Sequence, residues 1–298
     1  MTLQQLKYAI TVADCGSMNE AAKRLFISQP GLSGTIRELE EELGLEIFLR
    51  SNRGITITPA GEEFLGYARQ VCAQYALLED KYAGRRSKKH FSVSMQHYSF
   101  AVRAFVDTVK QADDGEYEFA AHETRTYEII ENVKNFKSEL GVIYINDFNR
   151  KVMTKLLSEN SLEFTPLFDC DTYVYLWSGH PLADKSVISM DELGDYPCLA
   201  FDQGQNNSFY LAEEVKSTYE YKRLIRANDR ATMLNMMVGL NGYTLCSGII
   251  CAELNGDGYR AVPLKENEKM TIGYIKRKGA ALTPIANIYI EELQKYGY

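Results

Sequence analysis

The sequence predicts an α/β protein with an all-α N-terminal part, and two patterns carry that prediction. Over residues 3–43, apolar side chains recur at intervals of three and four, which is the period of amphipathic helices. From residue 91 onward, short apolar runs typical of strands alternate with amphipathic helical stretches, which indicates an α/β fold with a mostly parallel sheet. At 298 residues, the chain is long enough for two or three domains of the usual ~100 to 150 residues.

Three short helices are expected first. The first ends at Gly16, and the second opens at Ser17-Met18-Asn19-Glu20, which has the spacing of a capping box. The third opens at Ser28-Gln29-Pro30, because serine is a good N-cap and proline in the first turn removes only an amide that has no partner. Gly44 is expected to end it. Its buried stripe consists of Leu32, Ile36, Leu39 and Leu43.

A two-stranded wing and a long helix should follow. In residues 49–58, Ile55 and Ile57 alternate with threonines after an Asn-Arg-Gly turn, which is a strand pattern. A helix then starts at Thr58-Pro59, with apolar residues at intervals of four and three. Such a seam favours packing on a partner helix over packing on the helix's own domain, so we expect a homodimer. The seam residues are Phe64, Ala68, Val71, Tyr75, Leu78 and Tyr82.

The polar stretch from Gly84 to Lys89 is expected to be a hinge between domains. The expected domains are 1–58, a linker helix and hinge at 59–89, and 90–298. Strands are expected at 91–95, 116–123, 140–145, 172–177, 198–201 and 242–246. Helices are expected at 101–112, 127–136, 208–219 and 232–238.

The exposed face of the third helix has the chemistry for reading DNA. All glutamates of this helix lie in its C-terminal half, from Glu38 to Glu42, so the N-terminal half carries no negative side chain. Glutamine can read adenine, serine can bond either base edge, and a helix N-terminus favours phosphate. Cations on a wing would contact the backbone beside the groove. The candidate DNA-binding residues are Ser28, Gln29, Pro30, Ser33, Gly34, Thr35, Arg37, Arg50, Arg53 and Thr58.

Charge and composition narrow the function classes. The net charge is -7, but residues 1–88 hold 11 Lys or Arg against 11 Asp or Glu, and a neutral segment can bind DNA when its cations face one way. No run of ~18 apolar residues could span a bilayer and no signal peptide is apparent, so we expect a cytoplasmic protein without a membrane partner. The six cysteines are scattered, so neither a metal site, another cofactor nor a disulfide framework is expected.

The first sixty residues resemble the DNA-binding domain of LysR-type transcriptional regulators. The resemblance is specific because several short signatures occur in the family's order without gaps. These are Gly16-Ser17, Ala21-Ala22-x-x-Leu25, Ser28-Gln29-Pro30-x-Leu32-Ser33, Leu39-Glu40, Leu43-Gly44, Phe48-x-Arg50 and Thr58-Pro59-Ala60-Gly61. A looser resemblance to the family's effector domain continues in HPLADKSVISMDEL (180–193), LNGYTLCSGI (240–249) and VPL (262–264).

The resemblance implies a winged helix-turn-helix, a long linker helix and a two-lobed effector domain similar to periplasmic solute-binding proteins. Lobe I would comprise 91–163 plus 269–298, and lobe II 164–268. The implied partners are double-stranded DNA, a small-molecule effector, further copies of the chain up to a homotetramer, and RNA polymerase. The effector is expected to be a small polar or anionic metabolite, because polar side chains cluster at predicted strand ends. Ligands in such sheets lie beyond the carboxyl ends of strands. That rule selects Gln96, His97, Tyr98, Ser99, Asn146, Phe148, Phe201, Gln203 and Ser247.

Two other function classes compete with this interpretation. An enzyme is not expected, because no nucleophile elbow, dinucleotide fingerprint or P-loop occurs and the four histidines are isolated. A thiol redox sensor of the same family remains the alternative. It would use Cys246 with Cys251, or Cys170 with Cys198.

Overall fold

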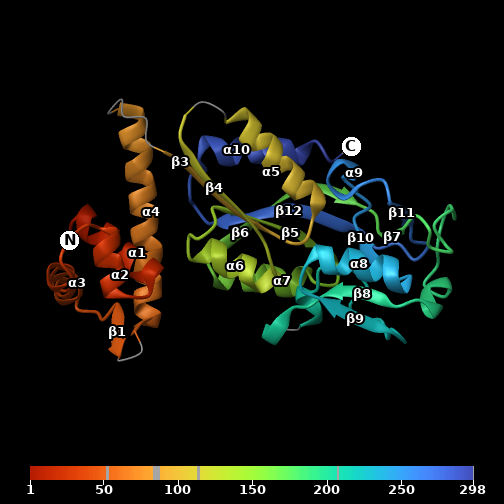
Figure 1. The fold of residues 1–298 in the computed structure, drawn as a ribbon, viewed down its shortest axis with the longest axis horizontal. Helices are drawn as coiled ribbons and strands as arrows, with labels where there is room; N and C mark the ends of the chain where they lie inside the picture. The colour runs from red at the N-terminus through yellow and green to blue at the C-terminus, as the bar shows by residue number, and fades with distance from the viewer. Residues whose placement is uncertain (52–53, 83–87, 113–114, 207, 298) are drawn as a thin grey trace. The chain divides into compact units, whose positions relative to one another are not determined.

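The computed structural model describes residues 1–51, 54–82, 88–112, 115–206 and 208–297, and it separates into two compact units, 1–88 and 89–298. The first unit begins with three helices, α1 (Leu3–Cys15), α2 (Met18–Arg24) and α3 (Gln29–Leu43). It continues with the antiparallel pair β1 (Phe48–Ser51) and β2 (Gly54–Ile57) and the long helix α4 (Pro59–Tyr82). This confirms the predicted winged helix-turn-helix followed by a long helix (Figure 1).

Local capping explains where these helices begin and end. Ser17 and Ser28 are extended N-caps whose hydroxyls accept from amides three residues on. Gly16 and Gly44 end α1 and α3 in the left-handed conformation, which glycine adopts without a steric penalty. The apolar stripe of α3 packs with α1, α2 and the wing into one core that includes Leu32, Ile36, Leu39, Ile47 and Phe48.

The second unit contains a five-stranded sheet in the order β4-β3-β5-β12-β6. Its strands are β3 (Lys89–Met95), β4 (Tyr117–Glu123), β5 (Leu140–Ile145), β6 (Leu162–Cys170) and β12 (Met270–Arg277). Val142 and Tyr144 belong to the core with α5 (Ser99–Gln111) and α10 (Pro284–Gln294). Ile143 and Ile145 belong to the core with α6 (Thr126–Lys134) and α7 (Arg150–Glu159). The helices therefore cover both faces of the sheet (Figure 1).

A second group of strands lies between β6 and β12 in the sequence, and we call it lobe II, with the five-stranded sheet as lobe I. Its three-stranded sheet has the order β10-β7-β11, and β8 pairs with β9 in a separate ladder. The strands are β7 (Tyr173–Trp177), β8 (Cys198–Phe201), β9 (Leu224–Ala227), β10 (Thr244–Cys246) and β11 (Tyr259–Pro263). The helices are α8 (Arg230–Leu240) and α9 (Ala252–Asn255), with 3-10 turns at Glu192–Asp195, Gly204–Asn206 and Phe209–Leu211.

Three expectations about this unit are wrong. The sheets are mixed rather than mostly parallel, because β12 runs antiparallel to both β5 and β6, and β7 is antiparallel to its neighbours. The strand β6 stays in the lobe I sheet to Cys170, past the expected boundary at residue 163, because it pairs with β12 along its length. The helix expected at 208–219 is a single 3-10 turn followed by irregular chain.

The irregular chain has a physical cause. Glu213, Glu214 and Val215 are all buried, although consecutive side chains on an α-helix point about 100° apart. Both glutamates accept hydrogen bonds from other segments, Glu213 from His97 and Glu214 from the Phe201 amide. These tertiary contacts outweigh the helical pattern of the sequence.

Candidate DNA-binding surface and effector cavity

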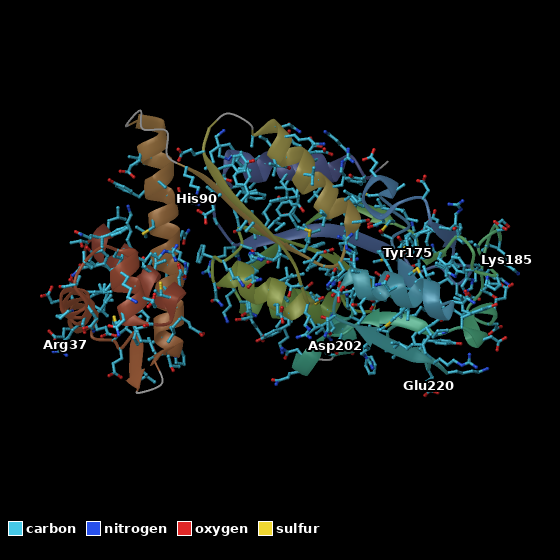
Figure 2. The ribbon with its side chains drawn as sticks, in the orientation of Figure 1. Arg37, His90, Tyr175, Lys185, Asp202 and Glu220 are labelled. Carbon is cyan, nitrogen blue, oxygen red and sulfur yellow. The ribbon has the colours of Figure 1, made fainter. Side chains whose placement is uncertain are left out.

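The N-terminal half of α3 presents a polar surface without negative charge. The Ser28 hydroxyl accepts from the Gly31 amide at 3.3 Å, and no acidic residue lies in the first turn. Pro30, Gly34 and Arg37 are exposed (Figure 2 labels Arg37 on this helix). Anions near such a helix start are favoured by its dipole and its free amides.

The other candidates for DNA contact have varied surroundings. Gln29, Ser33 and Thr35 are half-buried on α3, and the Thr35 hydroxyl donates to the Gly31 carbonyl at 3.0 Å. The Thr58 hydroxyl donates to the Glu46 carbonyl at 2.6 Å and accepts from the Gly61 amide at 2.8 Å, so it is occupied in holding the start of α4. Arg50 lies in β1 opposite Ile55 of β2, and Arg53 lies outside the described residues.

The expected seam of α4 divides into two parts. Ala68 is buried and Phe64 packs against the core of its own unit. Further along, Val71, Tyr75 and Leu78 are 50%, 40% and 58% exposed, and the ammonium of Lys7 lies 5.6 Å from the centre of the Tyr75 ring. The side chain of Tyr82 lies outside the described part. The apolar stripe that faces solvent is therefore the C-terminal half of the predicted seam.

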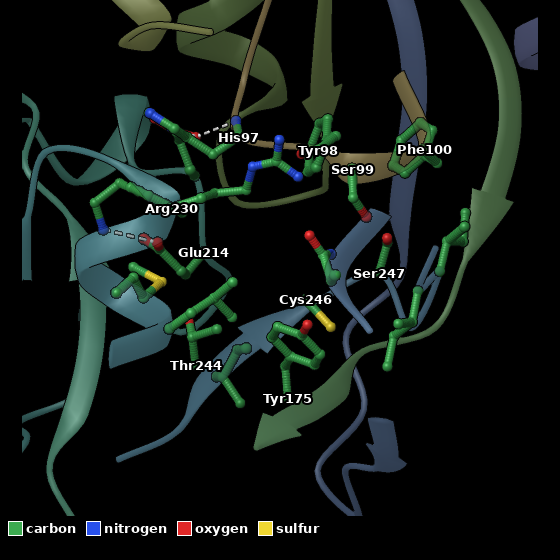
Figure 3. A pocket seen from close by; sticks show the side chains of 18 residues that line it. His97, Tyr98, Ser99, Phe100, Tyr175, Glu214, Arg230, Thr244, Cys246 and Ser247 are labelled. Atoms are coloured by element: carbon green, nitrogen blue, oxygen red, sulfur yellow. Dashed lines mark hydrogen bonds and ion pairs between the residues drawn. The ribbon is translucent and has the colours of Figure 1, made fainter. Parts of the chain in front are cut away.

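A cavity of about 80 Å³ lies between the lobes of the second unit (Figure 3). Lobe I contributes the turn from β3 into α5, which contains four consecutive lining residues, 97–100. Lobe II contributes β7, β8, β10, α8 and the segment that holds Glu213 and Glu214. Five residues selected at strand ends line it, namely His97, Tyr98, Ser99, Phe201 and Ser247.

The other four selected residues do not line this cavity. The buried Gln96 side chain donates to the Thr126 hydroxyl at 2.7 Å and accepts from the Tyr144 amide at 3.0 Å. Gln203 bonds across the lobes, accepting from the Thr126 amide and donating to Glu213. Asn146 exchanges hydrogen bonds with Asn149 at the start of α7, and the half-exposed Phe148 stacks on Tyr210. These side chains support the fold beside the cavity.

His97 and Glu213 hold the two lobes together. Glu213 Oε2 accepts from the His97 backbone amide at 2.9 Å and lies 2.8 Å from His97 Nδ1, while the ring stacks on Phe201 at 3.8 Å between centroids. Burial lowers the pKa of His97, but the hydrogen bond and charge of Glu213 together with Glu123 outweigh it and leave the pKa raised. Protonation of the imidazole therefore strengthens this contact between lobes.

Glu214 is a buried carboxyl group in the cavity wall. Its Oε1 accepts from the Phe201 amide at 2.9 Å. Burial, and secondarily the charge of Glu213, raises the pKa of Glu214 to about 8. The group is consequently mostly neutral at pH 7.

The lobe II cavity residues that sequence reasoning missed include Tyr175, Arg230 and Thr244. Arg230, at the start of α8, forms an ion pair with Glu123 of lobe I, with 2.8 Å between Nε and Oε1. It follows β9, so the rule of strand carboxyl ends could have found it. Tyr175 and Thr244 lie within antiparallel strands, to which that rule does not apply.

The four cysteines of the redox-sensing alternative are buried or half-buried. Burial raises the pKa of Cys246 to about 11 and the pKa values of Cys170 and Cys198 to about 12. The thiolate is the reactive form, so these thiols are poor nucleophiles at neutral pH. Cys251 is also buried. Burial of these thiols thus does not favour the redox-sensing alternative.

The described residues offer neither a cluster of metal ligands nor a membrane-spanning helix. Within the described ranges, no group of three or more His, Cys, Asp or Glu side chains is placed to hold a metal ion. Among the same residues, no helix is both long and apolar enough to cross a membrane.

Comparisons with known proteins match this architecture. Residues 3–62 match the family model "Bacterial regulatory helix-turn-helix protein, lysR family", and residues 115–297 match "LysR substrate binding domain". Two relatives from Escherichia coli are each 24% identical over 95% of this chain. They are the uncharacterized HTH-type transcriptional regulator YbhD, covered to 88%, and the DNA-binding transcriptional dual regulator OxyR, covered to 91%.

Solved structures share the fold. A full-length OxyR variant from Pseudomonas aeruginosa has a TM-score of 0.69 at 20% identity, covering 99% of this chain and 95% of that one. The regulator CbnR in complex with its target DNA has a TM-score of 0.57 at 19% identity, with 99% of each chain covered. Both domain models match in the family's order, and the second alone spans more than half of the chain. The chain belongs to the LysR family of bacterial DNA-binding transcription regulators, with a LysR-type effector-binding domain after its helix-turn-helix.

Proposed function

We propose that this regulator reads its operator with the N-terminal half of α3. The observation that carries the proposal is the capped, exposed start of this helix, whose first turn holds no acidic residue. Gln29 would make a bidentate contact with adenine in the major groove, and Ser33 would bond a neighbouring base edge. Arg37, Arg50 and Arg53 would contact phosphates, which supply affinity without reading sequence.

Selection from random DNA tests this reading. Replacing Gln29 by alanine should weaken binding at one base position by roughly 1 to 3 kcal/mol and relax the preference there. Gln4→Ala is the control, because Gln4 is exposed on α1, where its amide donates to the Tyr8 hydroxyl. An unchanged base preference in Gln29→Ala would show that this residue does not read sequence.

We also propose self-association through α4. The exposed stripe of Val71, Tyr75 and Leu78 supports a dimer, because packing on a second copy of the helix would remove it from water. A dimer places two recognition helices on one DNA duplex and predicts an imperfect palindrome. Assembly of dimers into tetramers, contact with RNA polymerase, a cytoplasmic location and the absence of catalysis complete the proposal, since each accords with a transcription regulator.

The effector is proposed to bind in the cavity between the lobes. Five residues that the sequence selected meet there, and the cavity is closed by contacts between lobes such as His97–Glu213. A ligand that binds one arrangement of the lobes better than another shifts the protein toward that arrangement. A small polar or anionic metabolite is the proposed ligand, because Ser99 at the start of α5 lines the lobe I side and Ser247 lines the lobe II side.

A further inference from the structure

Polar atoms without partners gather on the lobe II side of the cavity. Thr244 and Tyr175 are directly opposite each other in the β10–β7 pair, so their side chains share one face of the sheet. The Thr244 hydroxyl and Nη1 of Arg230 are buried and have no hydrogen-bond partner among the described residues. The Tyr175 hydroxyl is buried as well; the Asn255 amide lies beside its oxygen, but its proton has no acceptor among the described residues. Thr244 is 5% exposed. Because an unpaired buried polar group costs free energy, this wall is incomplete without an acceptor from a ligand.

Glu123 holds Arg230 so that this free nitrogen is presented to the cavity. Glu123 Oε2 accepts from Arg230 Nη2 at 3.1 Å, and Glu123 Oε1 lies 2.8 Å from Nε. The carboxylate therefore occupies one side of the guanidinium and leaves Nη1 available. Figure 3 shows the guanidinium and the Tyr175 hydroxyl directed into the cavity.

The remaining walls of the cavity suit the apolar part of a ligand. Aliphatic, aromatic and sulfur-containing side chains make up much of the lining. They are Phe100, Phe201, Met233, Leu234, Leu245, Cys246, Ile249 and Ile250. The cavity volume is about 80 Å³, and a single water molecule needs roughly 10–15 Å³ of cavity volume. The cavity therefore has room for roughly five to eight water molecules, or for a ligand with about as many non-hydrogen atoms.

The charged side chains around the cavity favour a ligand with one negative group over a ligand with two. Arg230 supplies the free positive donor, whereas Glu213 is already engaged by His97 and Gln203. Glu214 has a pKa of about 8. A second anionic group of the ligand beside Glu214 would oppose ionisation of this carboxyl and would have no cation to pair with. A dianion would therefore leave one charge desolvated and unpaired.

We propose that the cavity binds a small monocarboxylic acid with an apolar body, whose carboxylate accepts hydrogen bonds from Arg230 Nη1, the Thr244 hydroxyl and the Tyr175 hydroxyl. This inference rests on the proposed function and assigns a chemical class to its effector. Charge-assisted hydrogen bonds to guanidinium supply the strongest polar contact, and the apolar body removes the hydrophobic walls from water.

Isothermal titration of the full-length protein tests the assignment. The probes are isovalerate and cyclopentanecarboxylate, with their amides and succinate as comparisons. Both acids should bind, and the amides and succinate should bind at least about tenfold more weakly. Arg230→Gln should weaken acid binding about 10- to 100-fold, and the nearly isosteric Thr244→Val about three- to tenfold. Arg260→Gln, at an exposed arginine that bonds only backbone carbonyls in the described part, should leave binding unchanged.

Three results would overturn the proposal. These are failure of both acids to bind at millimolar concentration, equal binding of acids and amides, and unchanged affinity in Arg230→Gln and Thr244→Val. If Arg230→Gln does not fold, Thr244→Val decides the matter. DNA binding measured on the same protein separates the ligand class from the proposed function. If the acids do not bind but sequence-specific DNA binding is intact, the ligand class is rejected. If the protein shows no sequence-specific DNA binding, the proposed function is rejected.

Discussion

The buried carboxyl of Glu214 should make the second unit less stable as the pH rises. The pKa of this group is about 8 in the folded protein and 4.5 as its ordinary value, so the folded state holds the proton more tightly. Its contribution to stability is therefore fully present below about pH 4.5 and is lost as the pH rises through 8. Glu214→Gln should remove this dependence, because the amide oxygen can still accept from the Phe201 amide.

The size of the effect follows from the two pKa values. Proton linkage at Glu214 lowers the free energy of unfolding by about 3 kcal/mol between pH 5.5 and pH 8. This loss is on the order of a third of a typical domain's stability. The raised pKa of His97 acts in the same direction, since its contribution is present below 6.5 and lost as the pH rises through the higher folded value. Because His97 is present in both proteins, the difference between Glu214→Gln and wild type isolates the pH dependence of stability that is due to Glu214.

Urea unfolding followed by tryptophan fluorescence measures this effect. The chain has 1 tryptophan, Trp177, which lies in β7 of lobe II and reports on that lobe. The free energy of unfolding should fall less steeply with pH in Glu214→Gln than in wild type, by about 3 kcal/mol over this range. Glu220→Gln, at an exposed glutamate of the same lobe, should follow the wild type. Coincident profiles for wild type and Glu214→Gln would refute the reasoning.

Three further predictions concern other parts of the protein. Leu78→Glu should weaken self-association at least about tenfold because it puts a charge into the apolar stripe, whereas Gln74→Glu should not; equal sedimentation behaviour of both would reject the α4 interface. Arg53→Ala should lower the slope of log affinity against log salt by about one and leave base preference intact; a changed preference would mean that it reads bases. Mild peroxide should produce no disulfide, because burial raises the pKa values of Cys170, Cys198 and Cys246; a reversible disulfide seen by mass spectrometry would restore the redox alternative.

Features fixed by local chemistry were predictable from the sequence. The start of α3 after Ser28 and its end before Gly44 are confirmed, because N-caps and left-handed glycines act within a few residues. The buried strand at 140–145 is confirmed, since an unbroken apolar run fits a strand covered on both faces.

Features fixed by contacts between distant segments were not predictable. The segment at 208–219 has a helical pattern, but Glu213 is held by His97 from the other lobe. The cavity wall made by Tyr175 and Thr244 depends on the register between β7 and β10, which lie about seventy residues apart. The order and direction of such strands follow from the packing of the whole unit, which no local pattern encodes.

Hydroxyl-radical footprinting of the full-length protein on its selected DNA site tests the central claim most directly. A dimer that inserts α3 of each copy into the major groove should protect two patches on one face of the duplex, about one helical turn or a whole multiple of it apart. The protected bases should form an imperfect palindrome, and Gln29→Ala should weaken protection on that site. Uniform protection along the duplex, or none above that on scrambled DNA, would contradict sequence-specific binding by this helix.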